Sequence, residues 1–459
     1  MEPELPNVII FITLLSLFII VPSLLSQITN GLYFGHDETV SLLVRNSSLD
    51  SQLTSTKEKA NVYVVWDDNN GIYFTFSQDG GIKFNTKIIL SNSNNFSSAP
   101  QIATTQKGDV YVVLVDIDNK TGYSNIEFIN SNDSGKTFSP QKELRGGKST
   151  SFFPQLAATE KGDVYVVWVD IDNKTGYSNI EFISSNDSGK TFSAQKELRS
   201  GKSVSSFPQL TATEKGDVYV VWVDLSNSTG DSNIEFISSN DEGKTFSPKK
   251  ELRGGDTISF SPQIAATEKG DVYVVWVDKS SKTGDSDITY RSSNDSGRIF
   301  DDRKKLRSNS LLSSSPQLAA TEKGDVYVVW ADKNSTTGDT DISFRSSHDS
   351  GRDFHRVINL NKGENKLSNS SLPQIATTAK DSVYVVWADN HIQFKEILAQ
   401  DALVGNTILL SNITAWSFSP QLTATGKGDV YVVWNDKNNT TDASLHFKRI
   451  SEYSFDRNS

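Results

Sequence analysis

The stretch "SNDSGKTFS", Ser131–Ser139, decides how the chain is organised, because the chain contains it more than once. It returns unchanged at Ser185–Ser193 and with one substitution, "SNDEGKTFS", at Ser239–Ser247. Six related copies place their central aspartates 54 residues apart, at Asp79, Asp133, Asp187, Asp241, Asp295 and Asp349. Self-similarity at a fixed period of this length is typical of repeat architectures.

Two further markers follow the same repeat. The sequence "VYVVW", or a near copy, starts at Val62, Val110, Val164, Val218, Val272, Val326, Val383 and Val430. The dipeptide "PQ" supplies Gln101, Gln155, Gln209, Gln263, Gln317, Gln374 and Gln421, and Gln52 follows a serine instead. In the unit from Pro154 to Leu198, "PQLAAT", "DVYVVWVD", "NIEFISS" and "TFSAQKEL" have the composition of four short strands. We name these strands A to D.

Four-stranded units repeated in this way predict an all-β protein, a single β-propeller of eight four-stranded blades. A solenoid is the alternative, but no capping units are visible. The segment "ETVSLLVRN", Glu38–Asn46, resembles a strand and precedes the first unit, whereas the last unit, from Pro420, lacks a clear strand D. We therefore expect the N-terminal strand to close the last blade, which leaves no exposed edge.

The opening motif has the form Ser-x-Asp-x-Gly-x-x-Phe, which suits a tight turn between strands C and D. Its carboxylate can accept hydrogen bonds from nearby backbone amides, and its glycine can adopt a positive φ. Its phenylalanine re-enters the sheet and can pack between blades, as Phe84, Phe138, Phe192, Phe246, Phe300 and Phe354. The alternative is that these aspartates bind metal or sugar. We expect the structural role, because each carboxylate already has a local task.

The motif resembles the Asp-box, or BNR, repeat of the sialidase superfamily. Six copies match, and the repeat covers about Glu38 to Ser459, although the last two units have lost the box. The resemblance implies a propeller. Family sialidases are six-bladed and hydrolyse terminal sialic acid, which they hold with three arginines beside a tyrosine nucleophile, a glutamate partner and an acid/base aspartate. Such a site needs groups that are unique to their blades.

This chain departs from the sialidase pattern. It has no Phe-Arg-Ile-Pro motif near its start, where the only early arginine is Arg45. Arg145, Arg199, Arg253 and Arg307 are 54 residues apart, so we expect them to lie around a rim and not to converge on one carboxylate. We predict no catalytic residue. We predict instead a non-catalytic module that binds a glycan or a surface protein. The alternatives are a divergent exo-α-sialidase, with a tyrosine such as Tyr290 as nucleophile, and a structural cell-surface component.

Candidate ligand-binding residues are aromatic and lie on the face that carries the B–C loops and the connections between blades. Phe153, Phe207, Phe260, Trp416 and Phe418 come just before a "PQ" dipeptide. Seven of the eight tryptophans belong to strand B, and Trp416 lies outside that pattern. Aromatic side chains suit sugar faces and protein hot spots. The alternative is that they pack under the loops.

Oxygen-rich loops on the same face raise the possibility of calcium. An aspartate ends strand B in every unit, at Asp67, Asp116, Asp170, Asp224, Asp278, Asp332, Asp389 and Asp436. Asp118 and Asp172 follow two of these, so Asp116, Asp118, Asp170 and Asp172 are the candidate calcium ligands. The alternative is a solvated loop with local hydrogen bonds. No other cofactor is expected.

Composition narrows the partners and the compartment. The net charge of −11 argues against nucleic acid, and the absence of cysteine excludes disulfides. The apolar run Asn7–Gln27 suits a signal peptide or a membrane anchor, so we divide the chain into such a segment at 1–30 and the propeller at 31–459. Both readings predict an extracellular or cell-surface protein that meets the membrane only through this segment. Sequons at Asn119, Asn173, Asn227 and Asn334 fit a glycoprotein.

Overall fold

A computed structural model shows an all-β protein and describes residues 42–45, 50–56, 60–68, 71–91, 95–145, 150–199, 201, 203–226, 230–255, 257–307, 311–361, 370–378, 382–398, 403–413, 415–426, 428–437 and 442–451. These residues contain strands and no helix, so the predicted all-β class is confirmed. Among them, no helix is long and apolar enough to span a membrane. The apolar run Asn7–Gln27 lies outside the described residues.

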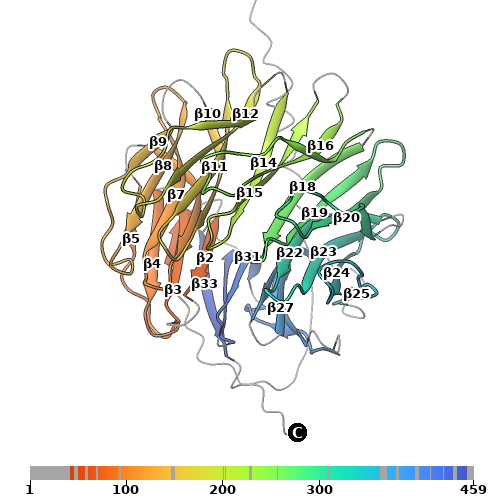
Figure 1. The fold of residues 1–459 in the computed structure, drawn as a ribbon. Helices are drawn as coiled ribbons and strands as arrows, with labels where there is room; N and C mark the ends of the chain where they lie inside the picture. Colours follow the sequence, from red (N-terminus) through yellow and green to blue (C-terminus); the bar gives the residue numbers. More distant parts are fainter. Residues whose placement is uncertain are drawn as a thin grey trace, which may run out of the picture.

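The described strands form four sheets, one of them with 20 strands, in which consecutive strands pair mostly antiparallel (Figure 1). To follow the sequence repeat, we group the strands by unit and call the eight groups blades 1 to 8. Blades 1 to 4 contain β2 (Ser51–Ser55), β3 (Val62–Asp68), β4 (Gly71–Ser77) and β5 (Ile88–Ile89); β6 (Phe96–Thr104), β7 (Val110–Ile117), β8 (Ser124–Ser131) and β9 (Lys142–Arg145); β10 (Thr150–Ala158), β11 (Val164–Ile171), β12 (Ser178–Ser185) and β13 (Lys196–Arg199); β14 (Val204–Ala212), β15 (Val218–Leu225), β16 (Ser232–Ser239) and β17 (Lys250–Arg253).

Blades 5 to 8 follow the same order, except that the last uses the N-terminal strand. They contain β18 (Thr257–Ala266), β19 (Val272–Ser280), β20 (Ser286–Ser293) and β21 (Lys304–Arg307); β22 (Leu311–Ala320), β23 (Val326–Asn334), β24 (Thr340–Ser347) and β25 (Ile358–Asn359); β26 (Ser371–Thr377), β27 (Ser382–Asp389), β28 (His391–Leu398), β29 (Leu403–Val404) and β30 (Ile408–Leu409); β31 (Trp416–Ala424), β32 (Val430–Lys437), β33 (Asp442–Ile450) and β1 (Leu42–Arg45).

Strands A and D differ from their predicted bounds. In blade 3, strand A begins at Thr150, ahead of the predicted Pro154, and carries a bulge between Phe152 and Gln155. Strand D covers only Lys196–Arg199, although "TFSAQKEL" was predicted to be strand throughout. The carboxylate of Asp187 accepts hydrogen bonds from Thr191 and keeps this residue in the turn, so strand D starts later than predicted.

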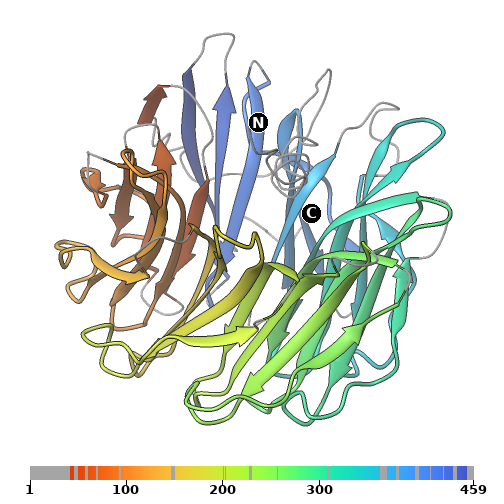
Figure 2. The same cartoon turned by 90° about the horizontal axis from the view of Figure 1, so that it is seen from above.

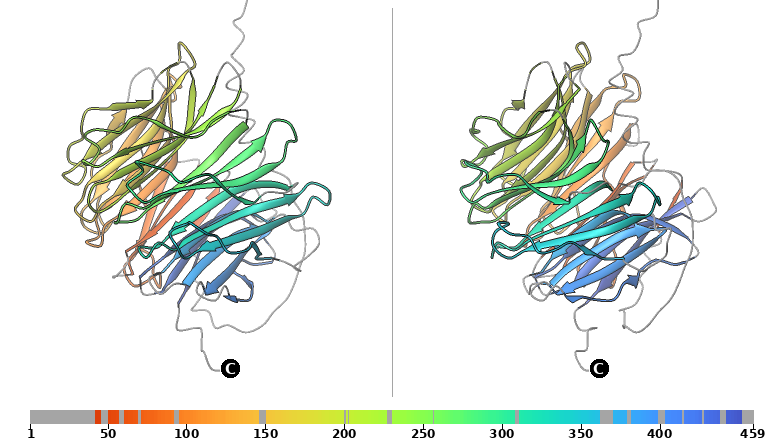
Figure 3. Two further views of the ribbon diagram at one scale, coloured as in Figure 1. Left: turned by 45° about the vertical axis from the view of Figure 1, so that its right-hand side comes forward. Right: turned by 90° about the vertical axis from the view of Figure 1, so that its right-hand side faces the viewer.

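Hydrophobic core fills the space between neighbouring blades. Strand B is buried along nearly its whole length, because its side chains alternate between two faces and a blade covers each face. At one boundary, Tyr165 and Val167 of blade 3 pack against Val220 and Trp222 of blade 4. Figure 3 shows these slanted sheets lying side by side. The repeated "VYVVW" sequence is therefore the core of every boundary.

The first and last blades are in contact. β1 pairs antiparallel with β33, from Leu42 opposite Leu445 to Arg45 opposite Asp442. Trp66 of blade 1 shares a core with Tyr431 of blade 8. Seen from above, the blades follow one another around a centre, with blade 8 (blue) beside blade 1 (orange-red) (Figure 2). These contacts support an eight-bladed ring closed by the N-terminal strand, which stays our prediction.

The repeated motif forms a turn that its own side chains hold together. In blade 3, the Ser185 hydroxyl donates to the Asp187 carboxylate (2.8 Å) and the Gly189 amide donates to Ser185 (2.9 Å). Thr191 donates its amide (2.8 Å) and its hydroxyl (2.6 Å) to the same carboxylate. These hydrogen bonds, first among them that of the Thr191 hydroxyl, lower the pKa of Asp187 to about 2. Each of the six aspartates accepts comparable turn bonds.

The phenylalanine that ends the motif packs across a blade boundary. The ring of Phe192 lies edge-on to Phe128 of the preceding blade, with centroids 4.9 Å apart. The same contact joins Phe138 to Phe74 and Phe84 to Phe447. The motif therefore closes a turn and connects two blades at once.

We expect Asp187→Ala to lower the free energy of unfolding by about 1–3 kcal/mol, because two Thr191 donors and the Ser185 hydroxyl lose their acceptor. Asn186→Ala is the matched control, since Asn186 is exposed in the same turn. We expect that control to stay within about 0.5 kcal/mol of the parent. Urea unfolding of both variants measures the difference, and equal losses would contradict the structural role of the carboxylate.

Candidate functional site

Strand A in blades 2 to 8 carries a strained residue directly before its proline. This residue has a positive φ in each case, at Ala99, Phe153, Phe207, Ser261, Ser315, Leu372 and Ser419 (50° to 53°). A residue before proline is normally extended, and a side chain at positive φ is strained. The strain accompanies a bulge at this point of the strand. A bulge re-aims side chains, here the aromatic residues that we predicted to bind ligand.

Three of the five predicted aromatic residues pack between blades. Phe153 and Phe207 are the strained residues of blades 3 and 4, and their ring centroids are 5.0 Å apart. Each also packs, partly buried, against the core of the boundary that follows. Phe260 packs in the same way against the core that contains Trp330. The alternative role in packing therefore accounts for these three rings.

Trp416 and Phe418 form a different arrangement at the start of β31. Their rings stack with centroids 5.0 Å apart and planes 29° apart, and Trp416 is 39% exposed. The other seven tryptophan positions are core: six are fully buried, and Trp434 is 4% exposed. Trp416 and Phe418 are two residues apart on one strand, so their side chains share a face of blade 8. They form the exposed aromatic platform of the candidate site.

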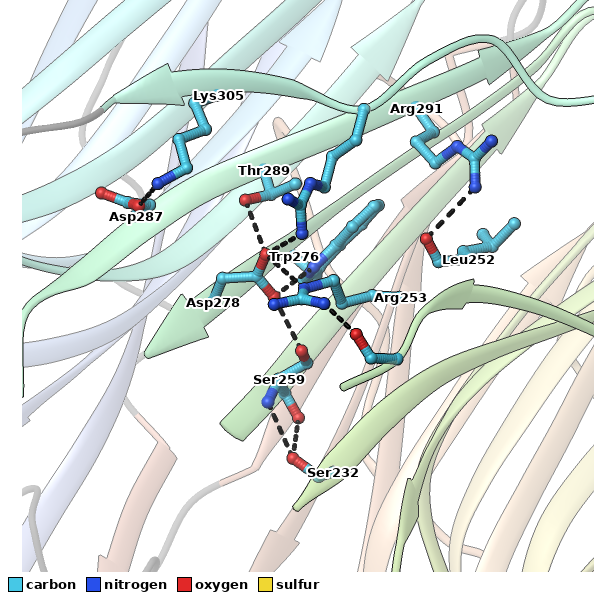
Figure 4. Close-up of polar contacts among 12 residues, drawn as sticks. Ser232, Leu252, Arg253, Ser259, Trp276, Asp278, Asp287, Thr289, Arg291 and Lys305 are labelled. Atoms are coloured by element: carbon cyan, nitrogen blue, oxygen red, sulfur yellow. Dashed lines mark hydrogen bonds and ion pairs between the residues drawn. The ribbon is translucent and has the colours of Figure 1, made fainter. Parts of the chain in front are cut away.

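The aspartate that ends strand B is the centre of a polar cluster that joins two blades (Figure 4). In blade 5, Asp278 accepts hydrogen bonds from Ser259 Oγ (2.7 Å), Trp276 Nε1 (2.7 Å) and Thr289 Oγ1 (3.1 Å). Arg253, at the end of strand D in blade 4, donates through Nε at 3.1 Å. The ion pair therefore ties blade 4 to blade 5, and we call it an Arg–Asp latch.

Four consecutive boundaries have this latch. The shortest nitrogen–oxygen distances are 3.0, 3.0, 3.1 and 3.2 Å for Arg145–Asp170, Arg199–Asp224, Arg253–Asp278 and Arg307–Asp332. Each of these arginines serves its own boundary, so they do not converge on a common point. The latch was missed at the sequence level, although the arginine precedes its aspartate by 25 residues in every case.

The predicted calcium ligands have protein partners. Asp116 accepts from Asn95 Nδ2 (2.6 Å) and Ser97 Oγ (2.7 Å), and Asp170 accepts from Arg145. Asp118 and Asp172 accept backbone amides of their own exposed loops, which lowers the pKa of both carboxyls. Within the described ranges, no group of three or more His, Cys, Asp or Glu side chains could hold a metal ion. The structure thus identifies no metal ligand there, and calcium binding stays an untested prediction.

In blade 8 the equivalent aspartate, Asp436, lies beside a histidine of its own blade, His446 of β33, so this contact does not join two blades. Asp436 lies 3.4 Å from Nε2 of His446, whose ring stacks on Trp434 with centroids 5.6 Å apart. Burial raises the pKa of Asp436 and lowers that of His446. Ser444 Oγ is 2.8 Å from the same Nε2 atom. In a catalytic triad, the serine and the carboxylate contact different nitrogens of the histidine ring. Here the Ser444 hydroxyl and the Asp436 carboxylate both lie at Nε2 of His446, so these three residues do not form a triad.

Tyr290, the tyrosine that we weighed as a nucleophile, lies in the core. It is fully buried, between Tyr273 (centroids 6.5 Å apart) and Phe354 (4.9 Å). Burial raises its pKa well above the ordinary value of 10. A tyrosine nucleophile must be accessible to substrate and must lose its proton. The Tyr290 hydroxyl is buried, and its raised pKa keeps it protonated.

Comparison with known proteins bears on the fold. No protein-family model matches the chain, and no curated protein sequence matches it significantly. Polysaccharide lyase Uly1 superposes with a TM-score of 0.52 at 10% identity, over 76% of this chain and 89% of that chain. This likeness shows a shared fold, and the chain is an all-β protein with a propeller-like fold.

Weaker likenesses are to two other glycan-related structures. The NanB sialidase from Streptococcus pneumoniae has a TM-score of 0.41 at 11% identity, over 86% of this chain and 84% of that chain. The α-L-arabinanase of Penicillium chrysogenum, complexed with arabinobiose, has a TM-score of 0.41 at 14% identity, over 66% and 93%.

Proposed function

We propose that the chain is a carbohydrate-binding β-propeller that holds its ligand on the Trp416–Phe418 platform and does not catalyse its cleavage. The observation that carries this proposal is the exposure of Trp416, since every other tryptophan of the chain is core. An exposed indole stacked on a second ring offers a flat apolar surface with a hydrogen-bond donor at its edge. A sugar ring, with one face of C–H groups and a rim of hydroxyls, fits such a surface.

The charges favour an uncharged glycan over an acidic one. An acidic sugar needs a guanidinium fork to bind its carboxylate bidentately. Four of the arginines are engaged in latches, and the net charge of the chain is −11. The fold that the chain shares with polysaccharide lyase Uly1 is compatible with a carbohydrate ligand, but the proposal rests on the platform. A surface protein that docks on the same rings is the competing partner.

The proposal includes a location outside the cytoplasm. It is supported by the apolar run Asn7–Gln27, which suits export or anchoring. Cleavage of that run and glycan occupancy at Asn119 or Asn173 are open to mass spectrometry of the protein from its natural source.

We expect Trp416→Ala to weaken binding on an array of neutral oligosaccharides by about thirtyfold or more, because a central aromatic anchor contributes about 2 kcal/mol or more. Ile413→Ala is the matched control, because Ile413 is 56% exposed near Trp416 in the chain and is not aromatic. Binding that survives Trp416→Ala, or that falls equally in Ile413→Ala, would contradict the proposed site.

The same preparation discriminates the enzyme alternative. We expect no release of the fluorophore from a fluorogenic sialoside, because the latched arginines and the buried Tyr290 do not form a sialic acid site. Turnover that Tyr290→Phe abolishes, while the variant keeps the melting temperature of the parent, would overturn the non-catalytic reading.

A further inference from the structure

One position of strand C is equivalent in successive blades but is occupied by different residue types. It is cross-strand to the tryptophan position of strand B and holds Glu127, Glu181, Glu235, Thr289 and Ser343 in blades 2 to 6. The tryptophan of strand B faces the preceding blade, as Trp168 does toward blade 2. The three glutamates therefore lie buried at blade boundaries, where a carboxylate without a cation is costly.

In blade 3, further acidic groups surround the glutamate. Glu181 is 3% exposed, and its Oε2 atom has no hydrogen-bond partner. Asp170 of β11 and Glu197 of β13 act on it as like charges, and Gln195 bonds to it through its side chain. Arg145 of the preceding blade is the nearby cation, but it donates to Asp170 at 3.0 Å. Two ionised carboxylates would share one guanidinium here, with Glu197 beside them.

Blade 2 repeats this arrangement with less compensation. Glu127 is buried beside Asp116 of β7 and Glu143 of β9, and both raise its pKa as like charges, after burial itself. Asp116 has Asn95 and Ser97 as partners in place of an arginine. The described contacts therefore give Glu127 no neutralising cation.

Blade 4 supplies the internal comparison. At one repeat position, blade 2 has Gln141, blade 3 has Gln195 and blade 4 has Lys249. Lys249 Nζ lies 2.8 Å from Glu235 and 3.7 Å from Asp224. In blade 5 the equivalent residue is Arg303, 3.6 Å from Asp278, and the glutamate has become Thr289. Blade 4 thus gives its buried glutamate a lysine and blade 5 has no glutamate at this position, whereas blades 2 and 3 combine the glutamate with a glutamine.

We propose that protons take the place of the missing cations in blades 2 and 3, so that Glu127 and Glu181 act as a pH-sensitive fastening of these two boundaries. The boundaries tighten in mild acid and loosen as the pH rises past neutrality. Blade 4 carries the same glutamate with a weaker response: burial also raises the pKa of Glu235, but Lys249 stabilises its charged form and offsets part of that rise.

The expected direction follows from the two protonation states. Burial, and then the neighbouring acids, raise the pKa of both Glu127 and Glu181 from 4.5 to about 7. A group whose pKa is raised in the folded state binds its proton more tightly there than in the unfolded chain. Its contribution to stability is complete below about pH 4.5 and disappears as the pH rises through about 7. This is opposite to the Asp187 carboxylate, whose contribution is lost in acid.

The test compares the parent with two double variants between pH 5 and 8.5. Glu127→Gln with Glu181→Gln mimics the protonated state, and Gln141→Lys with Gln195→Lys copies the blade 4 solution. We expect the unfolding equilibrium constant of the parent, relative to the glutamine variant, to rise by up to about tenfold per pH unit for each glutamate between pH 5 and 7. Relative to the lysine variant, which keeps both glutamates beside a cation, the rise should be smaller. The glutamine variant lacks only these two carboxyls, and the two lysines added in the lysine variant stay protonated over this pH range, so the titrating groups that the proteins share cancel in the ratio.

Hydrogen exchange at each pH, corrected for its intrinsic rate, locates the effect. Protection of β12 in the parent should fall as the pH rises, whereas that of β24 in blade 6 should not, because blade 6 has Ser343 at this position. If the glutamine variant does not fold, the lysine variant still decides the matter. Identical pH slopes in the parent and the lysine variant would overturn the proposal, as would an equal response of β12 and β24.

Discussion

Gly189→Ala should lower the free energy of unfolding by about 3 kcal/mol or more. Gly189 lies in the Asp187 turn at a φ of +78°, and an added Cβ atom would lie 2.4 Å from Cζ of Phe128. Phe128 cannot move aside, because it is buried and contacts the rings of Tyr111 and Phe192. Backbone strain and a steric clash therefore add together.

Gly176→Ala separates the two causes. Gly176 has nearly the same φ, +72°, but an added Cβ atom would have nothing within 4 Å. We expect this variant to lose only the cost of the left-handed backbone, about 1–2 kcal/mol. Denaturant unfolding of both variants measures the difference, which reports the packing of the turn against the preceding blade. Equal losses would show that the Phe128 contact imposes no cost of its own.

The second large effect concerns the Arg–Asp latch between blades 5 and 6. Arg307→Ala should destabilise the protein by about 3–5 kcal/mol, because among the described residues the buried Asp332 carboxylate then keeps only hydroxyl partners, Ser313 and Ser343. Arg253→Ala should cost less, since Arg303 lies 3.6 Å from Asp278 and can partly replace the lost cation. The order of the two losses is therefore predicted as well as their size.

Lys244→Ala is the control for charge removal at the surface. Lys244 pairs with Glu242 at 2.6 Å, but its side chain is 64% exposed, so we expect a change below about 1 kcal/mol. Thermal and denaturant unfolding of the three variants test the ranking. A loss at Arg307 as small as that at Lys244 would mean that the latch does not hold the blades together.

The repeat made much of the fold predictable. The 54-residue period and the "VYVVW" strands are properties of local sequence, and the turn around Asp187 is local too. The bounds of strand D were wrong because the same turn keeps Thr191 off the ladder, a competition that strand propensity does not reveal. The Arg–Asp latch was not predicted from the sequence, because its two residues belong to different units and the pattern within one unit does not pair them.

The candidate site was predictable in part. Trp416 lies outside the repeat pattern, and this irregularity indicated a side chain that the core does not use. Phe153 and Phe207 belong to the same aromatic set in the sequence, yet a positive φ before proline places them under the neighbouring blade. No residue preference predicts that conformation, because a residue before proline is normally extended and a residue other than glycine normally avoids a positive φ. Only the structure could therefore show which of the predicted aromatic side chains are exposed.

The pairing of β1 with β33 has a consequence for the order in which the protein folds. Nearly every other contact joins residues of one unit or of adjacent units, so these can form quickly and in any order. The pairing of Leu42 with Leu445 must wait until both ends of the chain have met, across every blade between them. We expect the repeated units to form first. The slowest step is then the search of one short strand for its only partner.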